Sequence, residues 1–321
     1  LAEEIAFYKF QQYEFDKQWT KLHAYANAQG IQIIGDIPIY VAMDSADTWA
    51  NPWLFKLDEK NCPTQVAGCP PDGFSATGQL WGNPLYNWEV HRNSGYEWWI
   101  KRIANCFRLY DVVRIDHFRG FDEYYAIPYG DATAENGWWE KGPGIDLFRA
   151  ISASLGDREI IAEDLGYMTD SVKRLVEESG YPNMKVIEFA FDERDTGNAS
   201  DYLPHNYRRN CVVYTGTHDN ETLLSWLEDI TPAERRQVRK YLNNFKDSGK
   251  ELCDDLICLV MQSVANLCIV PMQDYLGLDN SARMNQPSTL GKNWKWRLKE
   301  GQFTAELQKE MLELATRYGR R

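Results

Sequence analysis

Six short apolar runs recur along the chain, and most of them stop at a polar or charged side chain. Their apolar residues fall at consecutive positions, which is typical of strands buried on both faces of a parallel sheet. Segments with the apolar spacing of helices separate the runs. The runs lie at 31–39, 111–116, 159–164, 184–191, 211–217 and 267–274. This alternation predicts an α/β fold.

The helical segments can be placed from the spacing of their apolar residues and from their end signals. The spacing predicts helices over 1–29, 94–110, 145–155, 169–179 and 303–318. The first of these is expected to bury one face, made of Phe15, Trp19, Leu22 and Ala26. A further helix opens at Thr231, where Pro232 and Glu234 complete a capping-box pattern.

Two segments interrupt the alternation of strands and helices. Asp36 and Asp116, near the ends of the first two runs, are 80 residues apart, whereas one strand–helix–strand unit needs about 30. The stretch 62–84, rich in glycine and proline, is expected to be an ordered irregular loop. We therefore expect a single catalytic domain over 1–321 with an irregular insertion at about 40–93 and a smaller one at about 121–145.

Acid, amide or imidazole groups lie at or near the C-terminal ends of nearly all the runs. Loops that follow the strands build the site in a (β/α) barrel, so this pattern predicts a TIM barrel. A doubly wound sheet is disfavoured because neither G-x-G-x-x-G nor a P-loop is present. Six runs imply that the first two of eight barrel strands are missing. Open sheet edges aggregate, so we expect these 321 residues alone to be poorly soluble and inactive.

Composition excludes several classes of protein. A formal net charge of −12 disfavours nucleic acid or an anionic membrane as the partner, and no apolar stretch reaches the roughly 20 residues of a spanning helix. Seven scattered cysteines favour reduced thiols over a disulfide framework, and their spacing does not indicate a zinc site. The simplest compartment is the cytoplasm. Aromatic residues, 13% of the chain, can fill cores or form platforms for sugar rings.

Three acids at strand ends are the candidate chemical groups: Asp116, Glu163 and Asp219. Converging carboxylates suit glycoside chemistry, in which one is the nucleophile and another, with a raised pKa, is first acid and then base. Asp116 is the candidate nucleophile, and Arg114 would keep it ionised. Two alternatives stay open: a purely structural ion pair at Asp116, and a Mg²⁺ site built from the three acids and His218.

Six blocks of sequence point to one family. They read GDIPIYVAMDSADTWA (35–50), PPDGFSATGQLWGNPLY (70–86), VRIDHFRGF (113–121), IIAEDLG (160–166), YTGTHDNET (214–222) and ARMNQPST…NWKWR (282–297). In these blocks and their order the chain resembles the 4-α-glucanotransferases, or amylomaltases, of glycoside hydrolase family 77.

The resemblance implies a role for each matching residue. It makes Asp116 the nucleophile, Glu163 the general acid/base and Asp219 the acid that stabilises the transition state. It also implies substrate-binding residues, which are Asp36, Asp72, Phe74, Trp81, Arg114, His117, His218 and Asn285. No metal and no cofactor are implied.

The implied reaction is a retaining transfer of an α-1,4-glucan segment to the 4-hydroxyl of another glucan or of glucose. Maltooligosaccharides would be substrates, and the compartment would be the cytoplasm, or a plastid if the source is a plant. A plain α-glucan hydrolase is the close alternative. A non-catalytic glucan-binding protein is the alternative from another class, which the intact acids at 116, 163 and 219 disfavour.

Overall fold

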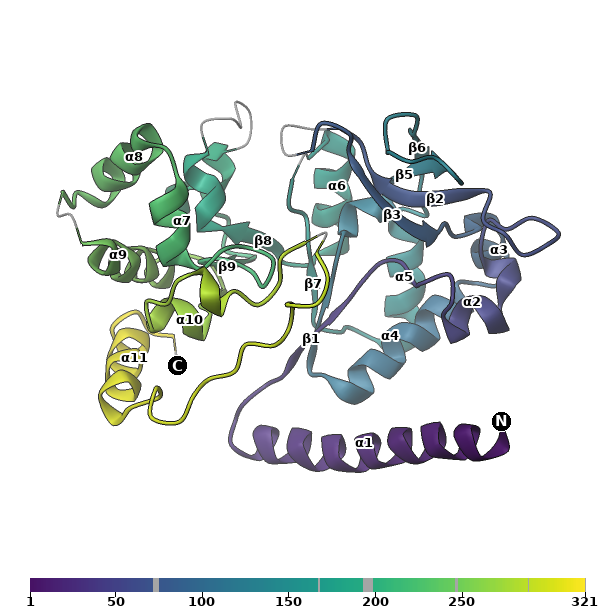
Figure 1. Cartoon of the computed structure of the whole chain (residues 1–321), viewed down its shortest axis with the longest axis horizontal. Helices are drawn as coiled ribbons and strands as arrows, with labels where there is room; N and C mark the ends of the chain where they lie inside the picture. The colour runs from purple at the N-terminus through teal and green to yellow at the C-terminus, as the bar shows by residue number, and fades with distance from the viewer. Residues whose placement is uncertain (72–74, 167, 193–198, 246–247, 288, 321) are drawn as a thin grey trace. The chain divides into compact units, whose positions relative to one another are not determined.

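The computed structural model describes residues 1–71, 75–166, 168–192, 199–245, 248–287 and 289–320. It contains two compact units, residues 1–182 and 183–321, each with parallel strands and helices (Figure 1). All six apolar runs contain a strand, so the predicted α/β alternation is confirmed.

Three parallel strands form the sheet that carries the predicted chemistry of the first unit. They are β1 (Ile34–Ile37), β4 (Val112–Ile115) and β7 (Ile160–Ala162), with β4 paired to both others. Every residue of β4 and β7 is buried, as expected for strands covered on both faces. The helices of this unit are α1 (Ala2–Ala28), α2 (Ala46–Ala50), α3 (Trp88–Asn93), α4 (Glu97–Leu109), α5 (Ile145–Leu155) and α6 (Asp170–Ser179).

The helices predicted over 1–29, 94–110, 145–155 and 169–179 are present as α1, α4, α5 and α6. In α6 the Thr169 side chain accepts a hydrogen bond from Val172 N, and Gly180 adopts the left-handed conformation that ends the helix. Trp99 and Ile103 of α4 are fully buried in the main apolar core, where α4 packs against α5 and α5 against α6.

The expected buried face of the first helix is wrong. Phe15 and Leu22 are 52% and 53% exposed, and no residue of α1 is buried. The helix touches the end of α4 through the Trp19 indole, which donates to Leu109 O at 2.8 Å, and through Asp16 with Arg108.

The prediction that segments 62–84 and 121–145 are irregular is also wrong. They contribute two strands each to a four-stranded antiparallel sheet in the order β3-β2-β5-β6. A glycine in this region marks a close approach of two strands, because a Cβ at Gly68 would lie 2.1 Å from Gln79 O. The strands are β2 (Gln65–Cys69), β3 (Gln79–Pro84), β5 (Glu123–Pro128) and β6 (Trp138–Lys141).

In the second unit, β9 (Cys211–Tyr214) pairs in parallel with β8 (Asn183–Val186) and with β10 (Leu267–Ile269). The predicted capping box of Thr231 and Glu234 is present. Glu188, expected inside a strand, lies instead in a 3-10 helix after β8, Ile187–Phe191. The helices are α7 (Leu223–Asp229), α8 (Pro232–Leu242), α9 (Gly249–Met261), α10 (Met272–Tyr275) and α11 (Ala305–Arg317).

Candidate active site

Asp116 follows β4 directly, and its carboxylate is held by a neighbouring guanidinium. Arg114 Nη2 donates to Asp116 Oδ1 at 3.0 Å, while Nη1 of the same side chain donates to Asp36 Oδ2 at 2.6 Å. The Arg114 side chain is only 8% exposed, whereas those of Asp36 and Asp116 are 39% and 43% exposed. A buried cation therefore fixes two carboxylates that remain open to solvent.

The strand register places these groups on one face of the sheet. Arg114 is paired with Asp36 on β1 and with Ile161 on β7. Residues two apart on a strand share a face, so Asp116 lies on the Arg114 face and Glu163 on the Ile161 face, which is the same one. Glu163 N donates to Ile115 O at 3.1 Å, which continues the ladder to the two acids.

Glu163 is buried, and two backbone groups bond its carboxyl. His117 N donates to Oε2 and Leu165 N to Oε1, both at 2.7 Å. Burial and the negative charge of Asp116 raise the pKa of Glu163 to about 7, against the opposing effects of Arg114 and the two N–H groups. Such a carboxyl can carry a proton near neutral pH.

His117 connects this acid to the antiparallel sheet. Its backbone is left-handed, with φ 52°, a conformation that costs a non-glycine residue free energy and that occurs often at functional sites. Its ring meets the Trp81 indole edge-on, with centroids 4.8 Å apart. Burial and the charge of Arg119 lower the pKa of His117 to about 3, so its imidazole is neutral at physiological pH.

The second unit carries the third predicted acid. Asp219 contacts two further predicted residues, since Asn285 Nδ2 donates to its Oδ1 and His218 Nε2 lies 3.3 Å from its Oδ2. Arg283 also donates to the backbone carbonyl of Asp219 at 2.6 Å. The Trp294 ring lies against the His218 ring, with centroids 5.0 Å apart.

The structure therefore groups the predicted site residues in two sets. Asp36, Arg114, Asp116, His117, Glu163 and Trp81 are connected in the first unit, and His218, Asp219 and Asn285 in the second. Asp72 and Phe74 lie outside the described residues.

The sequence indicated no role for Trp294 or for Asn220. Asn220 Oδ1 accepts a hydrogen bond from Thr217 N at 3.0 Å and so closes the turn 217–220. Their position inside the blocks 214–222 and 282–297 was the available signal.

Of the groups in the Mg²⁺ alternative, which were Asp116, Glu163, Asp219 and His218, Asp116 is paired with the Arg114 guanidinium. Among the residues that the structure describes, no group of three or more His, Cys, Asp or Glu side chains could hold a metal ion. In the same residues, no helix is both long and apolar enough to cross a bilayer.

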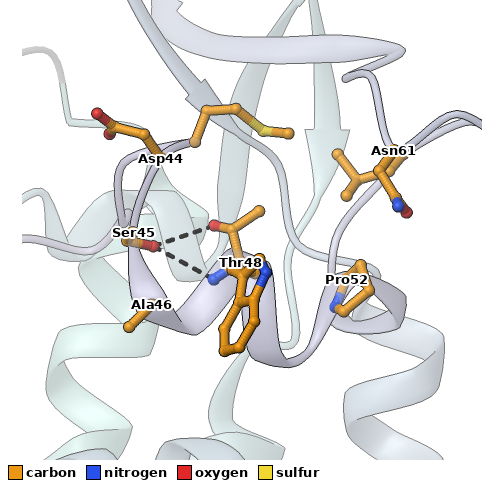
Figure 2. Close-up of a pocket in the computed structure, with 9 residues that line it drawn as sticks. Asp44, Ser45, Ala46, Thr48, Pro52 and Asn61 are labelled. Carbon is orange, nitrogen blue, oxygen red and sulfur yellow. Dashed lines mark hydrogen bonds between the residues drawn. The ribbon is translucent and has the colours of Figure 1, made fainter. Parts of the chain in front are cut away.

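A hollow of about 390 Å³ lies elsewhere in the first unit, beside α2 (Figure 2). Its hydroxyls are used inside the fold: Ser45 Oγ accepts from Thr48 N at 3.2 Å and lies 3.1 Å from Thr48 Oγ1. Among the described residues, none of those predicted for the site lines it. The lining residues are Met43, Asp44, Ser45, Ala46, Thr48, Trp49, Pro52, Leu57 and Asn61.

The chain is similar in sequence to proteins that share one description. The profile of a family described as 4-alpha-glucanotransferase matches residues 1–304. The chain is 50% identical over 322 residues to the 4-alpha-glucanotransferase of Clostridium butyricum, covering 100% of this chain and 65% of that one. It is 48% identical over 311 residues to the 4-alpha-glucanotransferase of Thermus thermophilus, covering 95% and 62%. The chain thus spans slightly less than two thirds of the length of these curated relatives.

Solved structures agree with the fold. An amylomaltase from Streptococcus agalactiae in complex with acarbose superposes with a TM-score of 0.95 at 43% identity, covering 100% of this chain and 64% of that one. An amylomaltase from Corynebacterium glutamicum superposes with a TM-score of 0.75 at 20% identity, covering 100% of this chain and 51% of that one. At this identity the similarity supports the fold alone. The predicted fold class, a partial (β/α) barrel, is confirmed.

Proposed function

This chain belongs to the 4-alpha-glucanotransferase family, and from that premise we propose that the protein transfers segments of α-1,4-glucans between glucan chains with retention of configuration. The observation that carries the proposal is the pair at the ends of β4 and β7. There a carboxyl with a pKa of about 7 neighbours a carboxylate that a buried guanidinium fixes in place.

The two carboxyl groups suit the two halves of a double displacement. Asp116 attacks the anomeric carbon of the donor, while Glu163 gives its proton to the glycosidic oxygen of the departing chain. The glucosyl unit is then esterified to Asp116. In the second half, Glu163 takes the proton of the acceptor 4-hydroxyl, the acceptor oxygen attacks the same carbon, and Asp116 leaves as a carboxylate. Every proton that Glu163 donates returns to it.

The remaining predicted residues are proposed as binding groups. Asp219 would stabilise the positive charge that develops on the sugar ring, and His218 and Asn285, its neighbours, would hold adjacent hydroxyls. In the first unit, neutral His117 with Trp81 offers an aromatic wall, and Asp36 and Arg114 offer polar contacts. The family resemblance alone supports the same role for Asp72 and Phe74.

The proposed substrates are maltooligosaccharides and longer α-1,4-glucans, with glucose also serving as an acceptor. The Streptococcus agalactiae relative supports a sugar-binding site, since its structure is described in complex with acarbose. We also propose a cytoplasmic location, because no disulfide joins any of the seven cysteines, all of which lie in the described residues, and a reducing compartment maintains that state.

The test is product analysis with maltotriose in the full-length protein. Transfer gives glucose together with oligosaccharides longer than the substrate, whereas hydrolysis gives only shorter sugars, and a binding protein gives no product. Asp116→Asn should lower the rate of product formation by at least about 10³-fold, while maltooligosaccharide binding persists. Asp111→Asn is the matched control, because Asp111 lies just before the same strand and accepts from Ile33 N.

A variant Asp116→Asn that retains more than a few per cent of transfer would contradict the proposed nucleophile. Only shorter sugars from the wild-type protein would instead support the hydrolase alternative.

A further inference from the structure

Glu188 is a buried carboxyl that the proposed mechanism does not use. It lies two residues after β8 and is 4% exposed. Its Oε2 accepts from Asn220 Nδ2 at 2.9 Å, while its Oε1 is buried with no hydrogen-bond partner among the described residues. A half-satisfied buried carboxyl destabilises a fold, so its presence calls for a reason.

The strand next to Glu188 leaves space for it. Val186, the last residue of β8, is paired with Tyr214, and Glu188 and Gly216 each lie two residues beyond this pair. A Cβ at Gly216 would lie 2.8 Å from Glu188 Oε1. This glycine does not have a positive φ, so space for the carboxyl is the reason for its small size.

Burial favours the protonated form of Glu188. Burial and, next, the negative charge of Asp274 raise its pKa well above the usual range, with a further contribution from Glu221 and against the opposing effects of Asn220 and Arg283. Asp274 itself is 2% exposed and accepts from Thr215 Oγ1 at 2.6 Å. A neutral carboxylic acid here is close in shape and charge to an amide.

Asn220 links Glu188 to the turn 217–220, which carries His218 and Asp219. Its Oδ1 accepts from Thr217 N at 3.0 Å and from Thr217 Oγ1 at 2.7 Å. Thr217 Oγ1 in turn accepts from Asp219 N at 3.3 Å. Because the Glu188 bond occupies the Asn220 amide nitrogen, the amide oxygen must point at Thr217, and an inverted amide would break the turn.

We propose that Glu188 is a positioning residue: through Asn220 and Thr217 it fixes the turn that orients Asp219 for glucan transfer. The inference rests on the proposed function of Asp219. Arg283 and Asn285 also hold Asp219, through its carbonyl and its carboxylate. The turn that Glu188 fixes is thus one of two supports for this residue.

Substitutions at Glu188 test this in the full-length protein with maltotriose. Glu188→Gln keeps the size, the neutral charge and the acceptor for Asn220, so kcat should stay within about threefold of wild type. Glu188→Leu removes the acceptor, and kcat should fall roughly tenfold to a hundredfold with KM nearly unchanged, because positioning acts on the transition state. Asn220→Ala should give the same loss, and the double variant should lose no more than either single one.

Thr231→Ala is the control for simple destabilisation, since it removes the α8 cap without touching this turn. It should lower the melting temperature and leave kcat unchanged. The proposal is overturned if Asn220→Ala keeps wild-type kcat, or if Glu188→Leu, like Thr231→Ala, is less stable but keeps the wild-type kcat per folded molecule. Asn220→Ala decides the matter even if Glu188→Leu does not fold. Failure of the proposed function would show separately, as absence of transfer in the wild-type protein.

Discussion

Glu163 shows how one residue acquires its chemistry from opposing influences. Desolvation and Asp116 raise its pKa, whereas Arg114 and the N–H groups of His117 and Leu165 lower it. The net value of about 7 means that burial and the neighbouring negative charge outweigh the groups that stabilise the carboxylate. The same residue can therefore give a proton in one half-reaction and accept one in the next.

This pKa predicts the pH dependence of transfer. Glu163 must be protonated to act as the acid, so kcat/KM should decline as pH rises through about 7, by about tenfold per unit at higher pH. Glu163→Gln should reduce transfer from maltotriose by roughly 10²–10⁴-fold and remove this limb. Steady-state kinetics between pH 5 and pH 9 would measure both effects.

The matched substrate for that experiment is α-maltotriosyl fluoride, whose leaving group needs no proton. In the first turnover, before the second half-reaction limits the rate, Glu163→Gln should still release fluoride from it at a rate much closer to that of the wild type. An equal loss on both substrates would mean that Glu163 is not the proton donor.

At the scale of elements, the antiparallel sheet depends on close approach at one glycine. A Cβ at Gly68 would meet Gln79 O at 2.1 Å and Ile127 Cδ1 at 2.4 Å, on the strands to either side of β2. Gly68→Ala should therefore lower the free energy of unfolding by about 1–3 kcal/mol, the usual cost of overpacking. Urea denaturation would measure the change.

Lys141→Ala offers a comparison in the same sheet, since the Lys141 side chain of β6 is 72% exposed and β6 lies at the edge of the sheet. Its replacement should lower the free energy of unfolding by about 0.5 kcal/mol or less, which is smaller than the expected effect of Gly68→Ala. Wild-type stability in Gly68→Ala would show that β2 can move away from β3 without cost.

The elements that the sequence predicted well are those with local signals. The strands β4 and β7 are continuous apolar runs, and the ends of α6 and α8 carry side-chain caps at Thr169 and Thr231. The missed sheet lacks such signals: β2 carries Gly68 and a register shift after Val66, and its pairing with β5 joins segments about 60 residues apart. Long-range pairing of this kind cannot be read from periodicity.

The prediction of a buried face on the first helix was wrong, because burial depends on what packs against that face. Phe15 and Leu22 have the spacing of a buried helix face, yet both are more than half exposed. Spacing specifies which residues share a face, not what covers that face. In contrast, the contacts among Asp36, Arg114 and Asp116 could be anticipated, because parallel strand ends bring consecutive strand termini to one edge of a sheet.

At the scale of the whole molecule, the proposed acids are divided between the two compact units. Asp116 and Glu163 belong to residues 1–182, and Asp219 belongs to residues 183–321. The order of the family's blocks along the chain, together with about 50% identity to 4-alpha-glucanotransferases, supports one reaction for all three.

Substitution of Asp219 tests that joint role. Asp219→Asn keeps the size of the side chain and removes its charge, so kcat should fall by roughly 10²–10³-fold if Asp219 stabilises the transition state. Asp229→Asn, an exposed change at the end of α7, should leave kcat unaltered. Comparable activity in the two variants would remove Asp219 from the mechanism. Initial rates of glucose release from maltotriose give the measurement.

The most direct test of the account is to identify the residue that carries the glucosyl intermediate. In Glu163→Gln, α-maltotriosyl fluoride can load the nucleophile, but the base that activates the acceptor is absent, so the ester should accumulate. Peptide mass spectrometry should then find a maltotriosyl group on Asp116. Fluoride release with the sugar attached to another residue, or with no attached sugar at any time, would contradict the account.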